Sequence, residues 1–357
     1  MKNLLPTSLQ PGAYVTRTEK PEQRFVVRNK TITRVGDGRL ISILGLASWF
    51  LVFRIFATQD VKAANDLFDT NKVLSIEIKM APADWKLLRY QHRESEFFPE
   101  EGITTATNAY SWFPAEVALN GGSFRKADVR KKGYIGSNDT KRPGLKIRFK
   151  QPPGRGSNSD DPELTLNNNN QDPALVRQAL AYEVFRRAGI PSPRCNFASV
   201  TVNGKSLGIY THVEAIKEPF LKRYFNSANG NLYEGGRSDF RPGWFQNFEI
   251  KNNKNTNHRA DLEAATRAIE STRESLMPVL DRYFNTEEFF LFWAVESLIN
   301  FGDGYAGNAN NFYLYHEMAT DRFVFIPWGA DTVLYPGRGL NSTKGDPKSV
   351  IGVGLLA

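Results

Sequence analysis

Residues 300–315 of this chain read Asn-Phe-Gly-Asp-Gly-Tyr-Ala-Gly-Asn-Ala-Asn-Asn-Phe-Tyr-Leu-Tyr, and residues 323–331 read Phe-Val-Phe-Ile-Pro-Trp-Gly-Ala-Asp. The pattern predicts an acid-bearing loop, a short strand, a turn, a second strand and a second acid directly after it. Phosphoryl transfer uses such a set of groups, because one carboxylate orients the hydroxyl nucleophile while an amide and a second carboxylate hold the metal ion. On spacing alone, a plain β-hairpin with polar ends explains the pattern equally well.

Length and composition indicate a chain with a substantial core and a basic leader. The 357 residues are 41% hydrophobic and 12% aromatic, which suffices for two or three domains or lobes. The formal net charge is +8, but residues 1–39 hold eight basic and three acidic side chains and so carry +5 of it. Because no basic stripe with interleaved aromatic residues stands out in the remainder, we expect no nucleic-acid partner.

The segment after the leader is short and apolar. Residues 40–53 are interrupted only by serine and glycine, which is short for a membrane span and fits the apolar part of a signal peptide. We therefore expect residues 40–63 to be a signal peptide or a signal-anchor. The basic leader predicts an N-terminus inside the cell and the rest outside it, either secreted or held at the membrane through residues 40–57. A buried core helix is the alternative.

The single cysteine and the four histidines argue against two kinds of site. One cysteine, Cys195, cannot form an internal disulfide, and with so few histidines no cluster has the spacing of zinc ligands. Cys195 begins a predicted strand, so we expect a small core side chain there and not a nucleophile.

The first half of the body alternates between apolar and polar residues, which predicts strands. A short helix is expected over residues 82–90. A second helix is expected to begin with Asp172 as N-cap and Pro173 in its first turn, and to end at Gly189. The predicted strands are residues 73–79, 115–119, 128–134, 145–150, 198–202 and 207–213.

The second half is predicted to be mostly helical from about residue 217. Asn285, with Glu288 three residues later, resembles a capping box and predicts a helix over residues 287–299. That helix leads directly to the acidic loop that holds Asp303.

The order of these elements predicts an α+β fold of two lobes. A β-rich first lobe with one helix would cover residues 64–216, and an α-rich second lobe with the catalytic loop would cover residues 217–357. A cleft between the lobes, near residues 214–234, is a natural place for a ligand.

Several long motifs, in the same order along the chain, point to one family. They are residues 166–170 (Leu-Asn-Asn-Asn-Asn), 172–194, 202–210 (Val-Asn-Gly-Lys-Ser-Leu-Gly-Ile-Tyr), 230–234 (Gly-Asn-Leu-Tyr-Glu), 310–315 and 326–328 (Ile-Pro-Trp). Together they resemble the CotH (spore-coat protein H) kinase family, over roughly residues 73–335. The resemblance implies an atypical, secreted or surface-located protein kinase with a reduced protein-kinase-like fold.

The resemblance also implies roles for the two acids. Asp303 matches the catalytic-loop aspartate, and Asp331 matches the last aspartate of the family's Trp-Asp-x-Asp motif, which binds Mg²⁺. Gly329 stands where the first aspartate of that motif is usual, so one potential ligand is missing. Family members continue further, so we expect a truncated second lobe. The metal-binding amide would be one of three asparagines: Asn308, Asn310 and Asn311.

A nucleotide site is expected on the first lobe. Lys146 lies on the non-core face of a predicted strand and Arg148 shares that face, so both are candidates to contact the phosphates of ATP. Glu183, on the predicted helix, is a candidate partner for Lys146. Glu214, in the segment that joins the lobes, is a candidate contact for the adenine. Each of these four side chains has a plain structural alternative as a solvated or paired charge.

Three classes of function fit these residues. The first is an extracytoplasmic kinase that transfers the γ-phosphoryl group of ATP to Ser or Thr of a surface protein, with Mg²⁺ or Mn²⁺ as the metal. The second is a catalytically weak or inactive kinase-like protein for surface binding or assembly, which Gly329 favours. The third is a hydrolase of surface glycans that uses Asp303 and Asp331 as its carboxylate pair.

Overall fold

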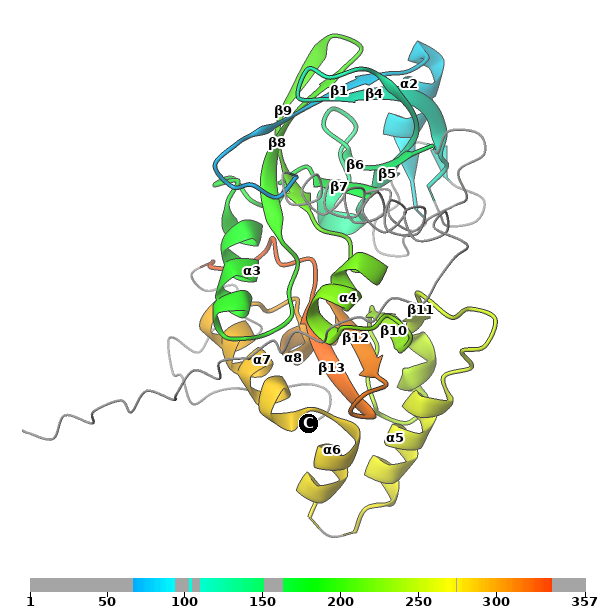
Figure 1. Ribbon diagram of the computed structural model, residues 1–357, viewed down its shortest axis with the longest axis vertical. Helices are drawn as coiled ribbons and strands as arrows, with labels where there is room; N and C mark the ends of the chain where they lie inside the picture. The colour runs from blue at the N-terminus through cyan, green and yellow to red at the C-terminus, as the bar shows by residue number, and fades with distance from the viewer. Residues whose placement is uncertain (1–66, 94–102, 105–109, 151–162, 274, 336–357) are drawn as a thin grey trace, which may run out of the picture. The chain divides into compact units, whose positions relative to one another are not determined.

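The computed structural model describes residues 67–93, 103–104, 110–150, 163–273 and 275–335, which form a mixed α+β fold (Figure 1). Within these residues there are seven α-helices and three sheets. The basic leader and the apolar segment expected at residues 1–63 lie outside the described ranges. None of the described helices is both long enough and apolar enough to cross a bilayer.

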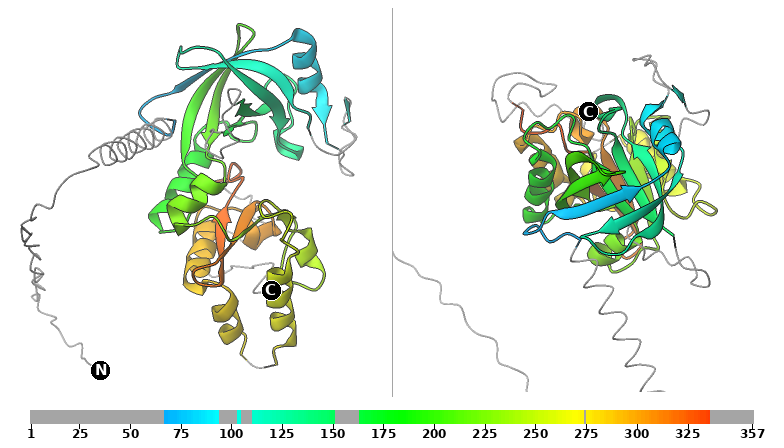
Figure 2. Two further views of the ribbon diagram at one scale, coloured as in Figure 1. Left: turned by 45° about the vertical axis from the view of Figure 1, so that its right-hand side comes forward. Right: turned by 90° about the horizontal axis from the view of Figure 1, so that it is seen from above.

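A closed barrel of seven strands forms the first part of the fold, and Figure 2 shows it from two further sides. Neighbouring strands run antiparallel except for β1 and β8, which close the barrel in parallel. In barrel order the strands are β1 (Leu74–Lys79), β4 (Phe113–Leu119), β5 (Arg125–Lys132), β6 (Gly144–Phe149), β7 (Glu163–Asn167), β9 (Lys205–Val213) and β8 (Cys195–Val202).

The alternation in the sequence decides which side chains fill the barrel. In β6, Leu145, Ile147 and Phe149 are buried inside, whereas Lys146 and Arg148 point outward, because successive side chains of a strand face opposite sides. Every strand predicted from alternation overlaps a barrel strand. The remaining elements of this part are α2 (Pro82–Tyr90), which matches its prediction, a two-residue pair of β2 (Gln91–His92) and β3 (Ile103–Thr104), and a 3₁₀ turn, η1 (Ile135–Ser137).

The helix expected from Asp172 begins later than predicted, as α3 (Arg177–Arg187). Asp172 caps a tight turn instead, since its carboxylate accepts hydrogen bonds from the backbone N–H of Ala174 at 3.0 Å and of Arg177 at 2.7 Å. Leu175, inside this turn, has a φ of +62°, which an α-helix does not allow. The prediction of a helix start at Asp172 and Pro173 is therefore wrong by one turn.

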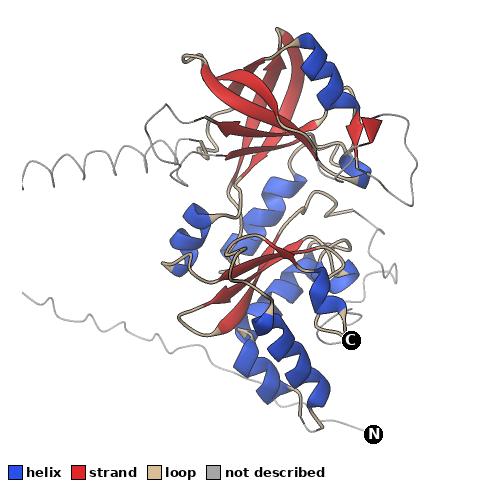
Figure 3. Cartoon of the chain, turned by 90° about the vertical axis from the view of Figure 1, so that its right-hand side faces the viewer, coloured by secondary structure: helices blue, strands red, loops and turns tan. Residues whose placement is uncertain are grey.

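A four-stranded sheet in the order β11, β10, β12, β13 organises the second part (Figure 3). This part is less helical than expected. Its sheet pairs strands that are far apart in the sequence, such as β10 with β12, and local sequence patterns do not predict such pairs. Its elements are α4 (Glu218–Phe225), β10 (Asn231–Gly235), η2 (Trp244–Asn247), β11 (Glu249–Ile250), α5 (Ala260–Ser271), α6 (Met277–Tyr283), α7 (Thr286–Leu298), α8 (Tyr305–Asn308), β12 (Phe312–Glu317) and β13 (Arg322–Pro327).

The two faces of this sheet have different partners. On one face, Phe312 and Phe325 belong to a large aromatic core with Phe289 and Phe292 of α7, whose rings lie 4.8 and 5.6 Å from that of Phe325. On the other face, Tyr313, Tyr315 and Ile326 cluster with Phe220 and Leu221 of α4. The mixed α+β class is confirmed; the finer expectation of a two-lobed, protein-kinase-like fold stays a prediction.

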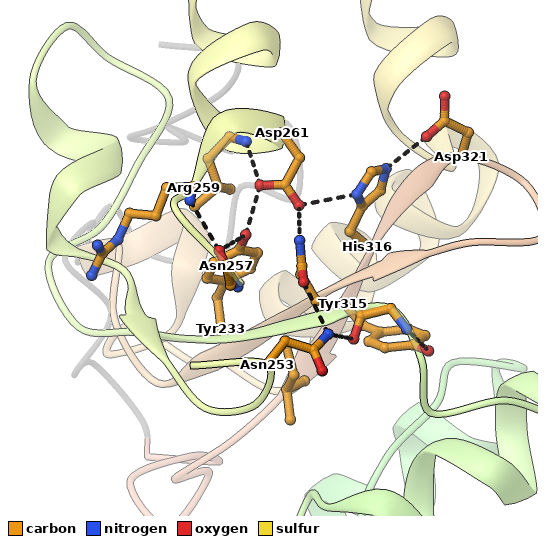
Figure 4. Close-up of polar contacts among 12 residues, drawn as sticks. Tyr233, Asn253, Asn257, Arg259, Asp261, Tyr315, His316 and Asp321 are labelled. Carbon is orange, nitrogen blue, oxygen red and sulfur yellow. Dashed lines mark hydrogen bonds and ion pairs between the residues drawn. The ribbon is translucent and has the colours of Figure 1, made fainter. Parts of the chain in front are cut away.

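A polar network fastens α5 to the sheet (Figure 4). Asp261 accepts hydrogen bonds from Tyr233 Oη at 2.6 Å and Asn231 Nδ2 at 2.9 Å, and its Oδ2 lies 3.0 Å from His316 Nδ1. The other ring nitrogen, His316 Nε2, lies 3.0 Å from the carboxylate of Asp321. Burial alone would lower the pKa of His316, but the two carboxylates outweigh it and raise the pKa. The imidazolium form therefore suits this position.

Candidate active site

The acidic loop is presented by the end of α7. The side chain of Asn285 accepts a hydrogen bond from the backbone N–H of Glu288 at 3.3 Å, which confirms the predicted N-cap. The helix ends at Leu298, and Asn300 then reverses the chain with a φ of +55°. Asp303 follows, directly before the short helix α8.

Three asparagine side chains surround the carboxylate of Asp303. Asn308 Nδ2 and Asn310 Nδ2 donate hydrogen bonds to Oδ1 at 2.7 and 3.2 Å, and Asn311 Nδ2 donates to Oδ2 at 2.7 Å. Asn311 Nδ2 also lies 3.0 Å from the backbone carbonyl oxygen of Asp303. The structure thus brings the aspartate and the three candidate amides together, and it fixes the carboxylate in one orientation.

The glycines of this loop are used for close packing. Residues 302–307 have the Gly-x-Gly-x-x-Gly spacing of a dinucleotide-binding motif, but that motif follows a strand and opens a full helix, whereas this loop follows α7 and precedes a helix of four residues. A Cβ at Gly307 would lie 2.3 Å from the carbonyl oxygen of Gly302, and one at Gly304 would lie 2.2 Å from Glu296 Oε1. Only glycine fits at these two positions.

Asp331, the second acid, comes four residues after β13 and contacts the barrel part of the fold. Its Oδ2 accepts a hydrogen bond from Asn167 Nδ2 at 2.9 Å, and Asn167 Nδ2 donates to Gln178 Oε1 at 2.8 Å. Burial raises the pKa of Asp331, and the charge of Asp303 acts in the same direction, while Asn167 and Lys132 oppose it. The two acids therefore lie within electrostatic range of each other.

Gly329 is fitted to the side chain of Asn311. Its φ is +55°, a backbone conformation that favours glycine. A Cβ at this position would lie only 2.4 Å from Asn311 Oδ1. The side-chain nitrogen of Asn311 thus donates to Asp303, and the side-chain oxygen of Asn311 occupies the space that a Cβ at position 329 would need.

The oxygen atoms of Asp331 and Asn311 suit a hard cation. Mg²⁺ in phosphoryl-transfer sites is bound by one or two carboxylates together with waters and substrate phosphates, not by an all-protein cage. Among the described residues, no group of three or more His, Cys, Asp or Glu side chains could hold a metal ion. The donor set fits a Mg²⁺ or Mn²⁺ ion that is shared with a nucleotide.

Lysines on the outer face of the barrel complete the site. Lys132 of β5 and Lys146 of β6 share this face, because Arg130, two residues before Lys132, pairs with Lys146 in the sheet register. Burial lowers the pKa of Lys132 to about 8, and the strongest opposing charge is that of Asp331. Lys132 therefore lies within electrostatic range of the second acid.

Glu163 of β7 holds Lys146 in place. Lys146 Nζ lies 3.1 Å from Glu163 Oε1, and Lys217 Nζ lies 2.6 Å from Oε2. Burial alone would raise the pKa of Glu163, but the two lysines outweigh burial and bring it down to about 2. Lys146 thus pairs with a glutamate of the neighbouring strand and not with the helix glutamate that was expected.

The prediction that Glu183 pairs with Lys146 is wrong. Glu183 binds Arg186 at 2.6 Å and Arg187 at 2.8 Å on the solvent side of α3. Side chains three and four residues apart on a helix are neighbours, so Glu183 pairs with these two arginines of its own helix and not with Lys146. Arg148 does lie on the face of Lys146, but it is 53% exposed, pairs with Asp128 at 3.4 Å and stacks over Trp112.

Glu214 is buried in an ion-pair cluster. Its Oε1 lies 2.9 Å from Arg194 Nη2, and its Oε2 accepts a hydrogen bond from Arg223 Nη2 at 2.7 Å. Although burial alone would raise the pKa of Glu214, the two arginines outweigh it and lower the pKa. Both oxygens are engaged in holding α4 to the end of β9, so a contact with adenine stays a prediction that this geometry does not support.

Neither Lys132 nor Glu163 was identified from the sequence, and Asn167 was included only within the motif of residues 166–170. Lys132 was recognisable, because it alternates in step with the outward residues of its strand. Glu163 and Asn167 carried no such signal, since they meet their partners through sheet register and across 164 residues of sequence, respectively.

Comparison with known proteins agrees with these motifs. A family model described as "CotH kinase protein" matches residues 122–348. The chain is 28% identical over 218 residues to the inner spore coat protein H of Bacillus subtilis (strain 168), which covers 56% of this chain and 57% of that protein. It is also 25% identical over 146 residues to the spore coat protein homolog 1 of Rhizopus delemar, which covers 38% of this chain and 24% of that protein.

A third relative matches over a shorter stretch. The inner spore coat protein H-like protein of Bacillus subtilis is 39% identical over 51 residues, 14% of this chain and 17% of that protein. These matches extend over less than two thirds of each relative. The family match, in contrast, covers more than half of the present chain and includes both Asp303 and Asp331. This protein therefore belongs to the CotH kinase protein family.

Proposed function

We propose that this protein is a kinase that transfers the γ-phosphoryl group of ATP to a Ser or Thr hydroxyl of an extracytoplasmic or surface protein. The observation that carries the proposal is that Asp331 lies within electrostatic range of both Asp303 and Lys132. Lys146 lies on the same outer face of the barrel as Lys132. Catalysis of phosphoryl transfer consists mainly of positioning and of charge stabilisation, and this arrangement supplies both.

In the proposed mechanism, Asp303 accepts a hydrogen bond from the acceptor hydroxyl and orients it toward the phosphorus atom. The three amides that surround Asp303 hold its carboxylate in place for that contact. Lys132 and Lys146 contact the phosphate oxygens and offset their negative charge. Asp331 and Asn311 would hold Mg²⁺ or Mn²⁺, which when bound neutralises charge on the β- and γ-phosphates.

The proposed location and acceptor rest on the names of the relatives. Three relatives are spore coat proteins or are named after them, which suggests a surface or extracellular location for this chain. We propose that the acceptor is a protein at that surface and that residues 40–63 direct export.

A second candidate function is a kinase-like binding or assembly protein with weak or no transfer activity. Gly329 favours it, because the family's usual aspartate at this position is absent and the space is taken by Asn311. Measuring Tm with and without ATP and Mg²⁺ tests whether the protein binds a nucleotide. A binding protein without a nucleotide site shows no shift in Tm.

The test is phosphoryl transfer from γ-labelled ATP, with Mg²⁺ or Mn²⁺, to the protein itself or to an added Ser/Thr-rich acceptor protein. Asp303→Asn and Asp331→Asn keep the shape of each side chain and should each lower the rate by about 100-fold or more. Asp281→Asn is the matched control, because Asp281 is an exposed aspartate on α6. Equal rates in all four proteins, or no label and no nucleotide binding, would refute the proposed kinase.

A further inference from the structure

A buried glutamate lies directly beneath the acidic loop. Glu296, on α7, is only 2% exposed, and both of its carboxylate oxygens accept backbone hydrogen bonds. Tyr305 N–H donates to Oε1 at 2.9 Å, and Ala306 N–H donates to Oε2 at 2.8 Å. These are the first two residues of α8, which follows Asp303, so the carboxylate joins α7 to the loop.

Burying this carboxylate is costly. Burial raises the pKa of Glu296 to about 8, and the backbone amides of Ala306 and Tyr305 oppose this effect. Among the residues that the structure describes, no ion pair involves Glu296. A buried acid without a cation gains no ion-pair energy from its position, and the contacts that it makes there are the two hydrogen bonds to the loop backbone.

Two of the groups that hold Asp303 depend on the segment that Glu296 binds. Gly304 fits against the carboxylate only because it lacks a Cβ. The carbonyl oxygen of Gly304 accepts hydrogen bonds from the backbone N–H of Asn308 at 2.9 Å and of Asn310 at 3.3 Å. Two of the three asparagines that fix Asp303, Asn308 and Asn310, are thus bound to the backbone of one glycine, which packs against Glu296.

We propose that Glu296 is a positioning residue for Asp303, which sets the placement of residues 303–308 and through them the orientation of the Asp303 carboxylate. The inference rests on the proposed kinase function and deepens it. Glu296 is buried and its carboxylate binds the backbone of the loop, so it would act through the loop.

A matched control lies on the same helix. Glu288 is also buried in α7, burial also raises its pKa to about 8, and its Oε2 accepts a hydrogen bond from the backbone N–H of Phe325 at 3.3 Å. Its carboxylate therefore supports β13, and within the described part of the chain its hydrogen-bond donor is Phe325, not a residue of 303–308. A purely structural role for buried acids of α7 predicts similar effects of Glu288→Gln and Glu296→Gln.

The experiment compares Glu296→Gln with Glu288→Gln and the unchanged protein in the transfer assay. Glutamine keeps the shape but replaces one acceptor oxygen by a donor NH₂, so one N–H of the loop loses its partner. We expect kcat of Glu296→Gln to fall about 10- to 100-fold, with KM for ATP unchanged within about twofold, because the lysines on the barrel are not disturbed. Glu288→Gln should keep kcat within about threefold. Equal losses of kcat in both variants, or an unchanged kcat in Glu296→Gln, would overturn the inference.

Amide hydrogen exchange separates this inference from the proposed function. If the unchanged protein transfers no label, the kinase proposal fails, but the exchange of residues 303–308 still reports on Glu296. Exchange of either the Tyr305 or the Ala306 amide should be at least about tenfold faster in Glu296→Gln than in Glu288→Gln, since one of these two N–H groups loses its buried acceptor. Unchanged exchange would show that Glu296 does not hold the loop.

Discussion

Replacing Glu163 by glutamine should destabilise the protein in a way that depends on pH. The two lysines hold the pKa of Glu163 at about 2, below its ordinary value of 4.5. At about 1.4 kcal/mol per pKa unit, this difference corresponds to about 3 kcal/mol of unfolding free energy at neutral pH. Because only 10% of the Glu163 side chain is exposed, solvent screens its ion pairs with the two lysines only weakly.

The sign of the pH dependence follows from the lowered pKa. A carboxylate with a depressed pKa stabilises the folded state at pH values above about 4.5, and this contribution disappears as the pH falls through about 2. The difference in unfolding free energy between the unchanged protein and Glu163→Gln should therefore be about 3 kcal/mol at pH 7 and about 1.4 kcal/mol at pH 3.

Urea unfolding followed by tryptophan fluorescence at pH 7, 4 and 3 measures this difference. Glu77→Gln is the matched control, because Glu77 is an exposed glutamate on barrel strand β1, and it should change the unfolding free energy by less than about 0.5 kcal/mol at each pH. A difference for Glu163→Gln below about 1 kcal/mol at pH 7, or one that stays constant down to pH 3, would refute the reasoning.

Three further predictions concern the site and the sheet. Gly329→Ala should lower the transfer rate about tenfold or more and cost about 1–2 kcal/mol of stability, because its Cβ would collide with Asn311 Oδ1 and its φ is positive; rate and urea unfolding measure the two effects. Lys132→Met should raise KM for ATP about tenfold with a smaller effect on Tm, since a partly buried cation beside the second acid is removed; steady-state kinetics measure it. The charged His316 contributes to the unfolding free energy fully below about pH 6.5, and this contribution is lost as the pH rises through the raised pKa of His316. His316→Gln should remove the contribution, and thermal unfolding from pH 5 to 9 measures the change.

Each of these three predictions has an outcome that contradicts it. A Gly329→Ala protein with unchanged transfer would show that Asn311 is not held in a required position. A Lys132→Met protein whose KM for ATP matches that of Lys205→Met would show that Lys132 is not part of the site, because Lys205 is an exposed lysine at the start of β9. If Tm depends on pH in the same way in the unchanged protein and in His316→Gln, then His316 is not charged in its contacts with Asp261 and Asp321.

The sequence predicted best what depends on near neighbours. Alternation identified strand β6 and the outward face of Lys146, and local capping chemistry identified the start of α7 at Asn285. Asp303 and its asparagines were found because they are at most eight residues apart.

What the sequence did not predict depends on competition or on distant pairing. The helix start at Asp172 failed because the same side chain caps a tight turn equally well, and Glu183 failed because it pairs with arginines on its own helix. Strand β10 and the contact between Asn167 and Asp331 join segments that are far apart in the chain, and local patterns hold no information on such pairings.

The closure of the barrel limits how another polypeptide can bind this protein. A ring of paired strands has no free row of backbone N–H and C=O groups, so an extended peptide cannot add to it as a further strand. In the four-stranded sheet the outer strands are β11, which has two residues, and β13, where the backbone of Phe323 already accepts a hydrogen bond from Asn285 N–H. An extended partner that binds the barrel or the four-stranded sheet is therefore recognised chiefly through its side chains.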